Sequence, residues 1–293
     1  MILNKHGSFY IRSGWPTKIL LALQNDEYIF SPNNELNAVD QIGVGRVMIK
    51  AMRYWATVLG LAEESHDNQG IKCHLTDLAN LIINNDLYCQ DIGTLWLLHR
   101  NLACSDEKAI VWYWAFNELK KNSFSKQTFS NDFFLFSTTG GNNFTLKAIE
   151  KEFDCFKNTY VSDKSFNINE VINENTIPFF APINLLTYEK GNFYKNTPTP
   201  KDIPLELLLY CIIEDNKILL NTSKQIDIDL LLNGKKQVGS YMNLSYTVLL
   251  DLLQKLDNSG YINLINNFGN RYIEIFENDS EKIIENYFSK MEA

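Results

Sequence analysis

The sequence of 293 residues contains no run of eighteen uninterrupted apolar residues, so it predicts no membrane-spanning helix. Its start, residues 1–7, lacks the apolar stretch of a signal peptide. The five cysteines are widely and irregularly spaced and include no Cys-x-x-Cys pair. An odd, scattered set predicts reduced thiols rather than a disulfide framework. These absences together predict a cytoplasmic protein.

Positive charge is also scarce, because 27 Lys and Arg stand against 35 Asp and Glu, for a formal net charge of −8. A protein that binds nucleic acid needs cations where the phosphates lie, so the overall balance argues against that class. The first 60 residues are an exception, with six Lys or Arg against four Asp or Glu. DNA binding therefore stays open only for a local basic surface near the N-terminus.

The sequence shows no recognisable nuclease motif, whether clustered carboxylates, a His-Asn-His arrangement or a Glu-x-Lys strand. The weak candidates are Glu150 and Asp154, which are one helical turn apart, with Lys147 beside them. Carboxylate oxygens suit Mg²⁺ or Mn²⁺, and such a metal can activate water for phosphodiester hydrolysis. Together with Lys151, the same residues also fit an exposed ladder of ion pairs. Both interpretations stay open.

Two further groups have a functional and a structural interpretation. His66, Cys73 and His74 lie close together, but zinc needs four well-spaced ligands and no second pair is evident, so we interpret them as polar residues of a hairpin. A set of aromatic residues could stack unpaired bases, although their helical spacing is more typical of a core. The set is Trp96, Trp112, Tyr113, Trp114 and Phe116.

The order of hydrophobic patterns predicts a mainly α-helical fold with small β-hairpins, of the α+β class. Helices are expected near 17–25, 35–42, 44–59, 92–104, 106–120, 125–137, 144–160, 205–213 and 245–257. Hairpins are expected at 61–75, around 190–192 and at 261–276. The order helix, helix, hairpin, helix in the first 90 residues is that of a winged helix-turn-helix.

Four parts follow from these patterns. They are a winged-helix DNA-binding domain at 1–90, an aromatic-rich helical region at 91–161, an irregular connection at 162–200 and a C-terminal helical domain, with a possible second winged helix, at 201–293.

The segment 44–59 has the features of a recognition helix. Its polar residues Arg46, Lys50, Arg53 and Thr57 fall within an arc of roughly 60°. The opposite side carries apolar residues, namely Val47, Ala51, Tyr54, Trp55 and Val58. No acidic residue occurs in the segment, so this face could enter a major groove, where Arg binds guanine and Lys binds phosphate. Arg12 and Lys18 are predicted as further DNA contacts. The alternative is a solvated basic face on an ordinary surface helix.

Several sequence phrases occur in a specific order and spacing over roughly the first 160 residues. They are Phe9-x-x-Arg12-x-Gly14-Trp15-x-x-Lys18, GVGRVMIKAMRYWATVLGL at 43–61, GTLWLLH at 93–99, WYWAFN at 112–117, Thr145-Leu-Lys147, DCF at 154–156 and TYV at 159–161. This set resembles the bacterial family of domain of unknown function 4007. The C-terminal half matches only in general layout. Ala79 departs from the family pattern, in which we expect glycine.

The resemblance implies a biological setting. Proteins of this kind accompany sulfur-transfer enzymes in DNA phosphorothioate modification and anti-phage defence, and the Ssp branch is regarded as nicking one DNA strand so that sulfur is installed. It implies a DNA-binding component with duplex DNA and other proteins of such a system as partners. It identifies no catalytic residue. The alternatives to a nickase are a non-catalytic DNA-binding scaffold and a transcription regulator.

Overall fold

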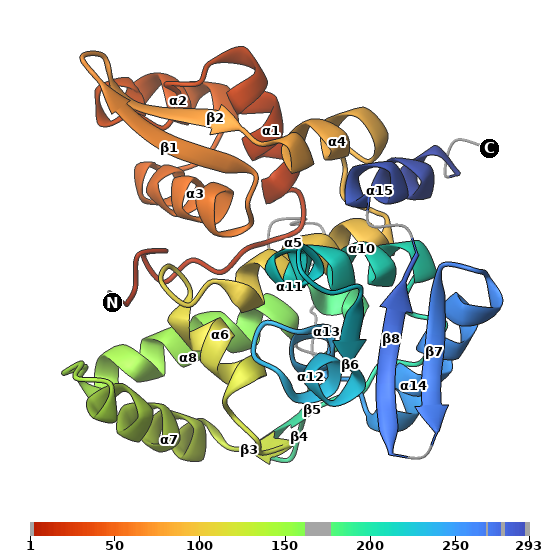
Figure 1. The fold of residues 1–293 in the computed structure, drawn as a ribbon. Coiled ribbons are helices and arrows are strands. Elements are labelled where there is room, and N and C mark those ends of the chain that lie inside the picture. The colour runs from red at the N-terminus through yellow and green to blue at the C-terminus, as the bar shows by residue number, and fades with distance from the viewer. Residues whose placement is uncertain (1–2, 162–176, 268, 277–278, 291–293) are drawn as a thin grey trace. The chain divides into compact units, whose positions relative to one another are not determined.

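The computed structural model describes residues 3–161, 177–267, 269–276 and 279–290. The chain forms two compact units, of which the first comprises residues 1–114 and 121–195 and the second residues 115–120 and 196–293. Both contain helices and small antiparallel sheets (Figure 1). The predicted α+β class is therefore confirmed. Residues 162–176 of the predicted irregular connection lie outside the described residues.

The first unit begins with a run of short helices and a hairpin. In order these are α1 (Trp15–Asn25), the 3₁₀ turn η1 (Pro32–Asn34), α2 (Glu35–Ile42), α3 (Arg46–Val58), β1 (Ala62–Asp67), β2 (Gly70–Leu75) and α4 (Asp77–Asn85). All four helices and the hairpin lie where the sequence predicts them. Pairing of β1 with β2 extends to Asp67 and Gly70, so the hairpin tip is short.

Glycine and threonine set the ends of these elements. Gly43 has φ 71° and ends α2, whereas Gly45 is the N-cap of α3, as expected for a tight turn between two helices. Gly60 follows α3 with φ +70°, and a Cβ there would lie 2.5 Å from the Asn101 side chain. The Thr76 side chain accepts a hydrogen bond from the Ala79 N–H and caps α4.

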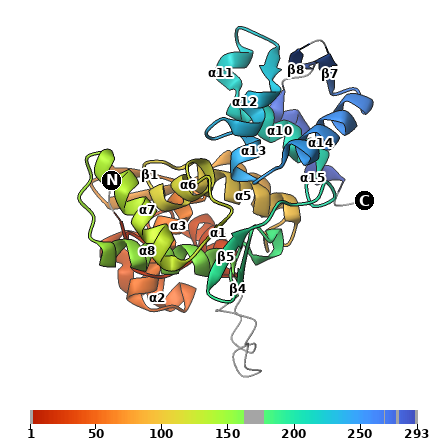
Figure 2. The ribbon, with the colours of Figure 1, turned by 90° about the horizontal axis from the view of Figure 1, so that it is seen from below.

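Four helices form the rest of the helical part, namely α5 (Ile92–Cys104), α6 (Ile110–Asn117), α7 (Lys126–Thr139) and α8 (Leu146–Tyr160). The helix expected at 106–120 is shorter at both ends. Residues 106–108 form a turn before it, in which the Asp106 N–H bonds to the Cys104 carbonyl, and the helix begins at Ile110. Helices α7 and α8 pack against each other (Figure 2).

Aromatic side chains fill the core of the first unit. Trp55 and Trp112 are fully buried with ring centroids 5.5 Å apart, and the Trp55 indole N–H donates to the Phe9 carbonyl at 2.9 Å. Phe129, Phe153 and others continue this cluster. All five aromatic residues considered for base stacking are buried. Their core interpretation is thus confirmed.

The hairpin predicted around residues 190–192 is present as β4 (Leu186–Glu189) and β5 (Asn192–Lys195). Lys190 and Gly191 have positive φ and form its turn. A two-residue strand that the sequence did not reveal, β3 (Ser123–Phe124), pairs with β5 to complete the sheet.

The second unit contains helices and a three-stranded sheet. Its elements from residue 205 onward are α10 (Leu205–Asp215), α11 (Lys217–Leu220), β6 (Gln225–Asp227), α12 (Ile228–Asn233), α13 (Val238–Tyr241), α14 (Tyr246–Asn258), β7 (Ile262–Asn267), β8 (Asn270–Ile275) and α15 (Ser280–Ser289). Helix α10 packs on α14 and α15, and the strand order is β6-β8-β7. The Ser245 side chain caps α14 by accepting a hydrogen bond from the Val248 N–H. Within the described ranges of either unit, no helix is long and apolar enough to cross a membrane.

Candidate nucleic-acid interface

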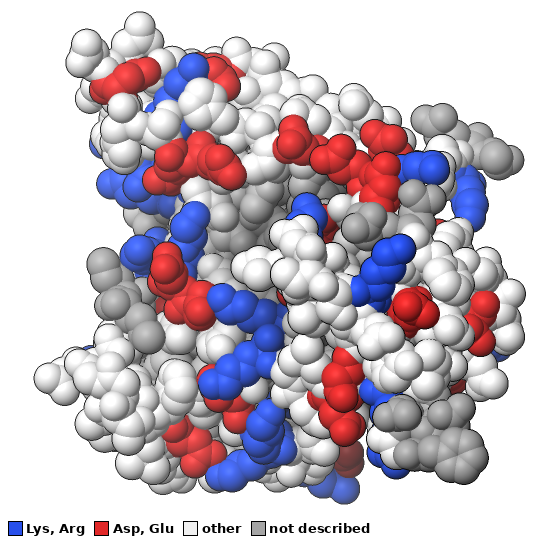
Figure 3. Space-filling model, viewed as in Figure 1, with Lys and Arg blue, Asp and Glu red and all other residues white. Residues whose placement is uncertain are grey.

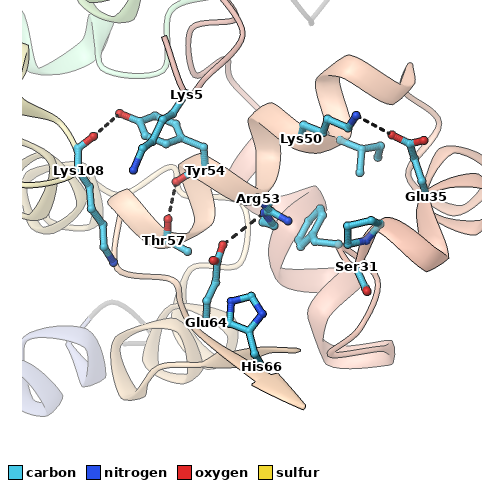
Figure 4. A pocket seen from close by; sticks show the side chains of 13 residues that line it. Lys5, Ser31, Glu35, Lys50, Arg53, Tyr54, Thr57, Glu64, His66 and Lys108 are labelled. Carbon is cyan, nitrogen blue, oxygen red and sulfur yellow. Dashed lines mark hydrogen bonds and ion pairs between the residues drawn. The ribbon is translucent and has the colours of Figure 1, made fainter. Parts of the chain in front are cut away.

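Helix α3 forms the floor of a hollow of about 830 Å³ on the first unit (Figure 4). Lining side chains come from the N-terminal segment, η1, α2, α3, β1 and the turn before α6. The charged ones are Lys5, Glu35, Lys50, Arg53, Glu64 and Lys108. Phe30, Ile49 and Tyr54 are buried and give the hollow an apolar base. In Figure 3, Lys and Arg gather over α3 and the N-terminal segment, with acidic residues between them.

Three of the predicted DNA-binding residues, Lys50, Arg53 and Thr57, line this hollow. Arg46 lies on the same helix and shares the Glu35 carboxylate with Lys50. The structure therefore places all four residues of the predicted basic face on α3, namely Arg46, Lys50, Arg53 and Thr57. The side chains of Arg46 and Lys50 are 61% and 71% exposed, whereas that of Arg53, further along the helix, is 31% exposed.

Carboxylates from other elements accompany these cations. Glu35 on α2 lies 4.0 Å from Arg46 Nε and 3.4 Å from Lys50 Nζ, and Glu64 on β1 lies 3.4 Å from Arg53 Nε. Sequence reasoning considered acids within the helix only, and so missed these neighbours. The carboxylates are partly buried, but all three pairs lie at the protein surface, where ion pairs contribute about 0–1 kcal/mol, so a phosphate can compete with the carboxylate for these cations.

The other two predicted contacts, Arg12 and Lys18, lie away from this hollow. The Arg12 guanidinium lies over the rings of Tyr10, Trp15 and Phe9, at 5.2–5.8 Å from their centroids. Lys18 Nζ donates to the Ile42 carbonyl at the end of α2, 3.1 Å away. Arg12 therefore packs on aromatic rings, and Lys18 binds the carbonyl at the end of α2.

The predicted apolar side of α3 is correct for Ala51, Tyr54, Trp55 and Val58, which are buried, but wrong for Val47. Val47 is 57% exposed. It lies in the first turn of α3, where the helix extends beyond the part that packs on the core.

No sequence pattern pointed to Lys5 and Lys108, the two cations that complete the hollow. Lys5 lies between two residues fixed by the buried Glu152: the Asn4 N–H donates to Glu152 Oε1 at 2.8 Å, and His6 Nε2 bonds to Glu152 Oε2. The Ser8 N–H donates to His6 Nδ1, so the proton of the neutral imidazole is on Nε2. No sequence pattern links positions 6 and 152.

Lys108 is tied to the floor of the hollow through its backbone. The Tyr54 hydroxyl donates to the Lys108 carbonyl at 3.1 Å. Burial, with a smaller contribution from the Glu152 carboxylate, raises the pKa of Tyr54 well above its ordinary value. The hydroxyl therefore stays protonated and keeps donating this hydrogen bond.

The catalytic candidates lie on α8, outside this hollow. Asp154 forms an ion pair with Lys126, 2.7 Å away, and both line a smaller hollow of about 290 Å³ with Lys157. Glu150 and Lys147 are exposed and do not line it. The structure thus brings Asp154 to a lysine from α7 rather than to Glu150.

Metal-binding side chains are not gathered in the part of the chain that the structure describes, where no group of three or more His, Cys, Asp or Glu could hold an ion. Of the three residues considered for zinc, His74 bonds to Glu27 and Ser65, and His66 lines the hollow beside α3. Burial raises the pKa of Cys73 to about 12, which disfavours the thiolate that a metal requires.

The fold and the hollow define a two-unit α+β protein with a concave site, lined by four cations and two carboxylates, beside helix α3. The chain belongs to the family described as protein of unknown function DUF4007, whose model matches residues 3–288. Among solved structures it is similar to one described as magnesium ion-bound SspB (19% identity, TM-score 0.85) and to another of SspB (19%, TM-score 0.82). Each comparison covers 99% of this chain and 89% of the other. No curated protein matches.

Proposed function

We propose that the chain is the DNA-binding component of a DNA phosphorothioate-modification system and that α3 contacts the DNA. The observation that carries this proposal is the hollow beside α3, where Lys5, Lys50, Arg53 and Lys108 meet on an otherwise acidic protein. Local cations of this kind provide the electrostatic attraction that a negative net charge would otherwise oppose.

The order of elements supports a winged-helix assignment for the N-terminal part. Helices α1, α2 and α3 are followed directly by the β1–β2 hairpin, so α3 has the position of a recognition helix and the hairpin that of a wing. The exposed start of α3 agrees with this role, because recognition helices contact bases through their N-terminal residues.

A second winged helix in the C-terminal unit is part of the same proposal. Helix α10, strand β6, helices α12 and α14 and the β7–β8 hairpin follow the corresponding order, with β8 between β6 and β7. Helix α14 carries Asp251 and Asp257 against Lys255, which pairs with Asp251. Because this helix offers no free cationic face among its described side chains, we assign DNA contact to α3.

The phosphorothioation setting rests on the family and on the sequence resemblance. The resemblance points to the Ssp branch, and the two similar structures are of SspB. The proposed partners are therefore duplex DNA and the other proteins of such a system.

Nicking of one strand, which the resemblance implies, is the catalytic part of the proposal. The acids on α8 do not fit a metal centre as they stand, because Asp154 is occupied by Lys126 and Glu150 lines no hollow with it. We therefore derive no hydrolytic step through a metal. Mg²⁺ and Mn²⁺ are the ions to supply in the assay.

Two measurements test the proposal. Fluorescence anisotropy with a labelled duplex should give weaker binding for the triple variant Arg46→Ala, Lys50→Ala, Arg53→Ala, with a salt slope shallower by about one unit for each lost phosphate contact. Unchanged affinity at two salt concentrations would remove α3 from the interface.

Incubation of supercoiled plasmid with the protein and either metal, alone and with neighbouring proteins, tests nicking. Binding without nicking under all these conditions leaves a non-catalytic scaffold or a transcription regulator.

A further inference from the structure

The smaller hollow on the first unit lies where the C-terminal part of α8 meets the β4–β5 hairpin (Figure 2). It has a volume of about 290 Å³ and shares no lining residue with the hollow beside α3. This size is near the lower end of the range of about 300–1,000 Å³ for ligand sites, so it suits one small ligand. We call it the α8 hollow, and the side chains that matter are Lys126, Asp154, Lys157, Asn158, Tyr188 and Phe193.

The hairpin gives the α8 hollow an aromatic wall with accessible surface. Tyr188 and Phe193 are a cross-strand pair, so their side chains project from the same face, and their ring centroids are 4.7 Å apart. Phe193 is buried against Phe153 of α8. Tyr188, in contrast, is 51% exposed. The Tyr188 ring therefore rests on a buried neighbour and still has surface for a ligand to stack on.

Helix α8 supplies polar groups to the same hollow. Lys157 and Asn158 are half-buried in its last turn, and within the described ranges neither side chain forms a hydrogen bond or an ion pair. Asp154, one turn earlier, accepts a hydrogen bond from Lys126 Nζ at 2.7 Å through Oδ2. Its other oxygen accepts none from the residues that the structure describes. An ammonium, a carboxamide and a carboxylate oxygen thus meet in the hollow with hydrogen-bonding capacity to spare.

We infer that the α8 hollow binds one nucleotide, with its base on the Tyr188 ring and its phosphate at Lys157. Bases stack on exposed aromatic side chains, and lysine forms charge-assisted hydrogen bonds with phosphate. Asn158 offers both a donor and an acceptor to the edge of a base. An inorganic anion would leave the Tyr188 ring unused, and a purely apolar molecule would leave Lys157 and Asn158 unpaired. A nucleotide uses all three groups at once.

A nucleotide can reach the α8 hollow from two sources. One is a free mononucleotide, and the other is a nucleotide turned out of a DNA duplex, as in enzymes that act on a single base. The chemistry at Lys157 and Tyr188 is the same for both. Only the second source depends on the proposed DNA-binding function, so the inference and that function are tested by different probes.

The test uses the full chain and two kinds of probe. Calorimetry and saturation-transfer NMR measure the binding of adenosine, guanosine, cytidine and uridine monophosphates, of the matching nucleosides and of inorganic phosphate. Fluorescence anisotropy compares a fully paired duplex with the same duplex carrying one extrahelical nucleotide.

The variants are Lys157→Ala, Tyr188→Ala and Tyr188→Phe. Two matched controls lie outside the hollow: Lys151→Ala removes an exposed lysine from the same helix, and Tyr194→Ala removes a tyrosine from the same hairpin that is 39% exposed. Tyr194 follows Phe193 directly, so its side chain lies on the other face of the hairpin. Thermal melts of each variant verify the fold.

For a free ligand, the mononucleotide that binds best should bind more tightly than inorganic phosphate and than its own nucleoside. Tyr188→Ala should weaken it by about fivefold or more, the loss expected for stacking on one aromatic ring, whereas Tyr188→Phe should change little. Lys157→Ala should weaken it by about three- to tenfold. Both controls should bind as the parent does. For a nucleotide from DNA, the extrahelical nucleotide should add affinity, and Tyr188→Ala should remove the gain.

The inference is overturned if no mononucleotide binds at millimolar concentration and the extrahelical nucleotide adds no affinity. It is also overturned if inorganic phosphate binds as tightly as every mononucleotide, or if the controls lose as much as Lys157→Ala and Tyr188→Ala. Mononucleotide binding without duplex binding at low salt would leave this inference standing and remove the proposed function. Duplex binding without any dependence on Tyr188 or Lys157 would do the reverse.

Discussion

At the scale of single residues, the cations of α3 are partly neutralised, because Arg46, Lys50 and Arg53 share two carboxylates, those of Glu35 and Glu64. Glu35 forms ion pairs with both Arg46 and Lys50, so one carboxylate competes with phosphate at two predicted DNA contacts. Glu35 is half-buried, but its partners Arg46 and Lys50 are exposed, and surface ion pairs contribute at most about 1 kcal/mol, so Glu35 acts mainly as a competitor for DNA.

Replacement of Glu35 by Gln should therefore strengthen duplex binding by about two- to fivefold at low salt, since both cations are released. Anisotropy titrations at several salt concentrations measure the effect, with Glu63→Gln, which does not line the hollow, as the control of equal charge change. Equal gains in the two variants would mean that only net charge matters, and a loss in Glu35→Gln would mean that Glu35 supports the site.

Trp55 is a structural residue inside the same helix. Its ring is fully buried, and its indole N–H donates to the Phe9 carbonyl. Trp55→Ala should lower the free energy of unfolding by about 3–5 kcal/mol. Trp55→Phe keeps most of the ring and should cost less. Urea denaturation measures both, and a Trp55→Ala protein as stable as the parent would contradict the observed packing.

At the scale of elements, capping residues and turns were predictable because their signals are local. Thr76 and Ser245 cap α4 and α14 through bonds to N–H groups three residues away. Strands β3 and β6 were not predictable, because they are two and three residues long and pair with distant strands. The walls of the hollow were missed for the same reason: Lys5 and Lys108 reach α3 only through contacts that the fold creates.

The β1–β2 hairpin is attached to the turn after α1 through Glu27. Its carboxylate accepts hydrogen bonds from Lys72 Nζ and His74 Nδ1, both at 3.0 Å, and its backbone carbonyl accepts from the Cys73 N–H. The hydrogen bond from Lys72 is the main reason that the pKa of Glu27 lies below its ordinary value, although desolvation opposes it. A lowered pKa means that the charged form is favoured in the folded protein.

Acid should therefore loosen this attachment. The contribution of Glu27 is complete above the ordinary glutamate pKa of about 4.3 and is lost as the pH falls through the lowered value. The protection of the Cys73 amide against hydrogen exchange, relative to the intrinsic rate at each pH, should fall over that acid range in the parent and already be low at neutral pH in Glu27→Gln. Identical exchange in parent and variant at all pH values would show that the backbone bond alone holds the hairpin.

At the scale of the whole molecule, the second unit is assembled from two separate stretches of the chain. Residues 115–120, which include the end of α6, belong with residues 196–293. The buried Asn117 side chain accepts a hydrogen bond from the Lys236 N–H at 2.6 Å, and Glu118 pairs with Lys235 at 2.6 Å. The four-part division drawn from the sequence could not anticipate this, because helical periodicity continues without a break through residue 114.

Asn117→Ala should therefore destabilise the second unit by about 1–3 kcal/mol, since a buried backbone N–H loses its acceptor. Hydrogen exchange followed by mass spectrometry should report faster exchange in peptides from 228–260, with peptides from α1 to α4 unchanged. Acceleration confined to the first unit would contradict the assignment of Asn117. Glu118→Gln, which removes only an exposed ion pair, is the milder comparison.

The divided second unit also has a consequence for synthesis of the chain. Residues 115–120 leave the ribosome long before residue 293 is added, and at about 5–20 residues per second the interval is on the order of ten seconds or more. Phe116 and Leu119 are buried in the finished protein, and during this interval they await a unit that is not yet translated. The first unit can fold while the end of helix α6 still exposes apolar residues. The nascent chain is therefore prone to aggregate until the second unit has been translated, and the length of that interval depends on the rate of translation.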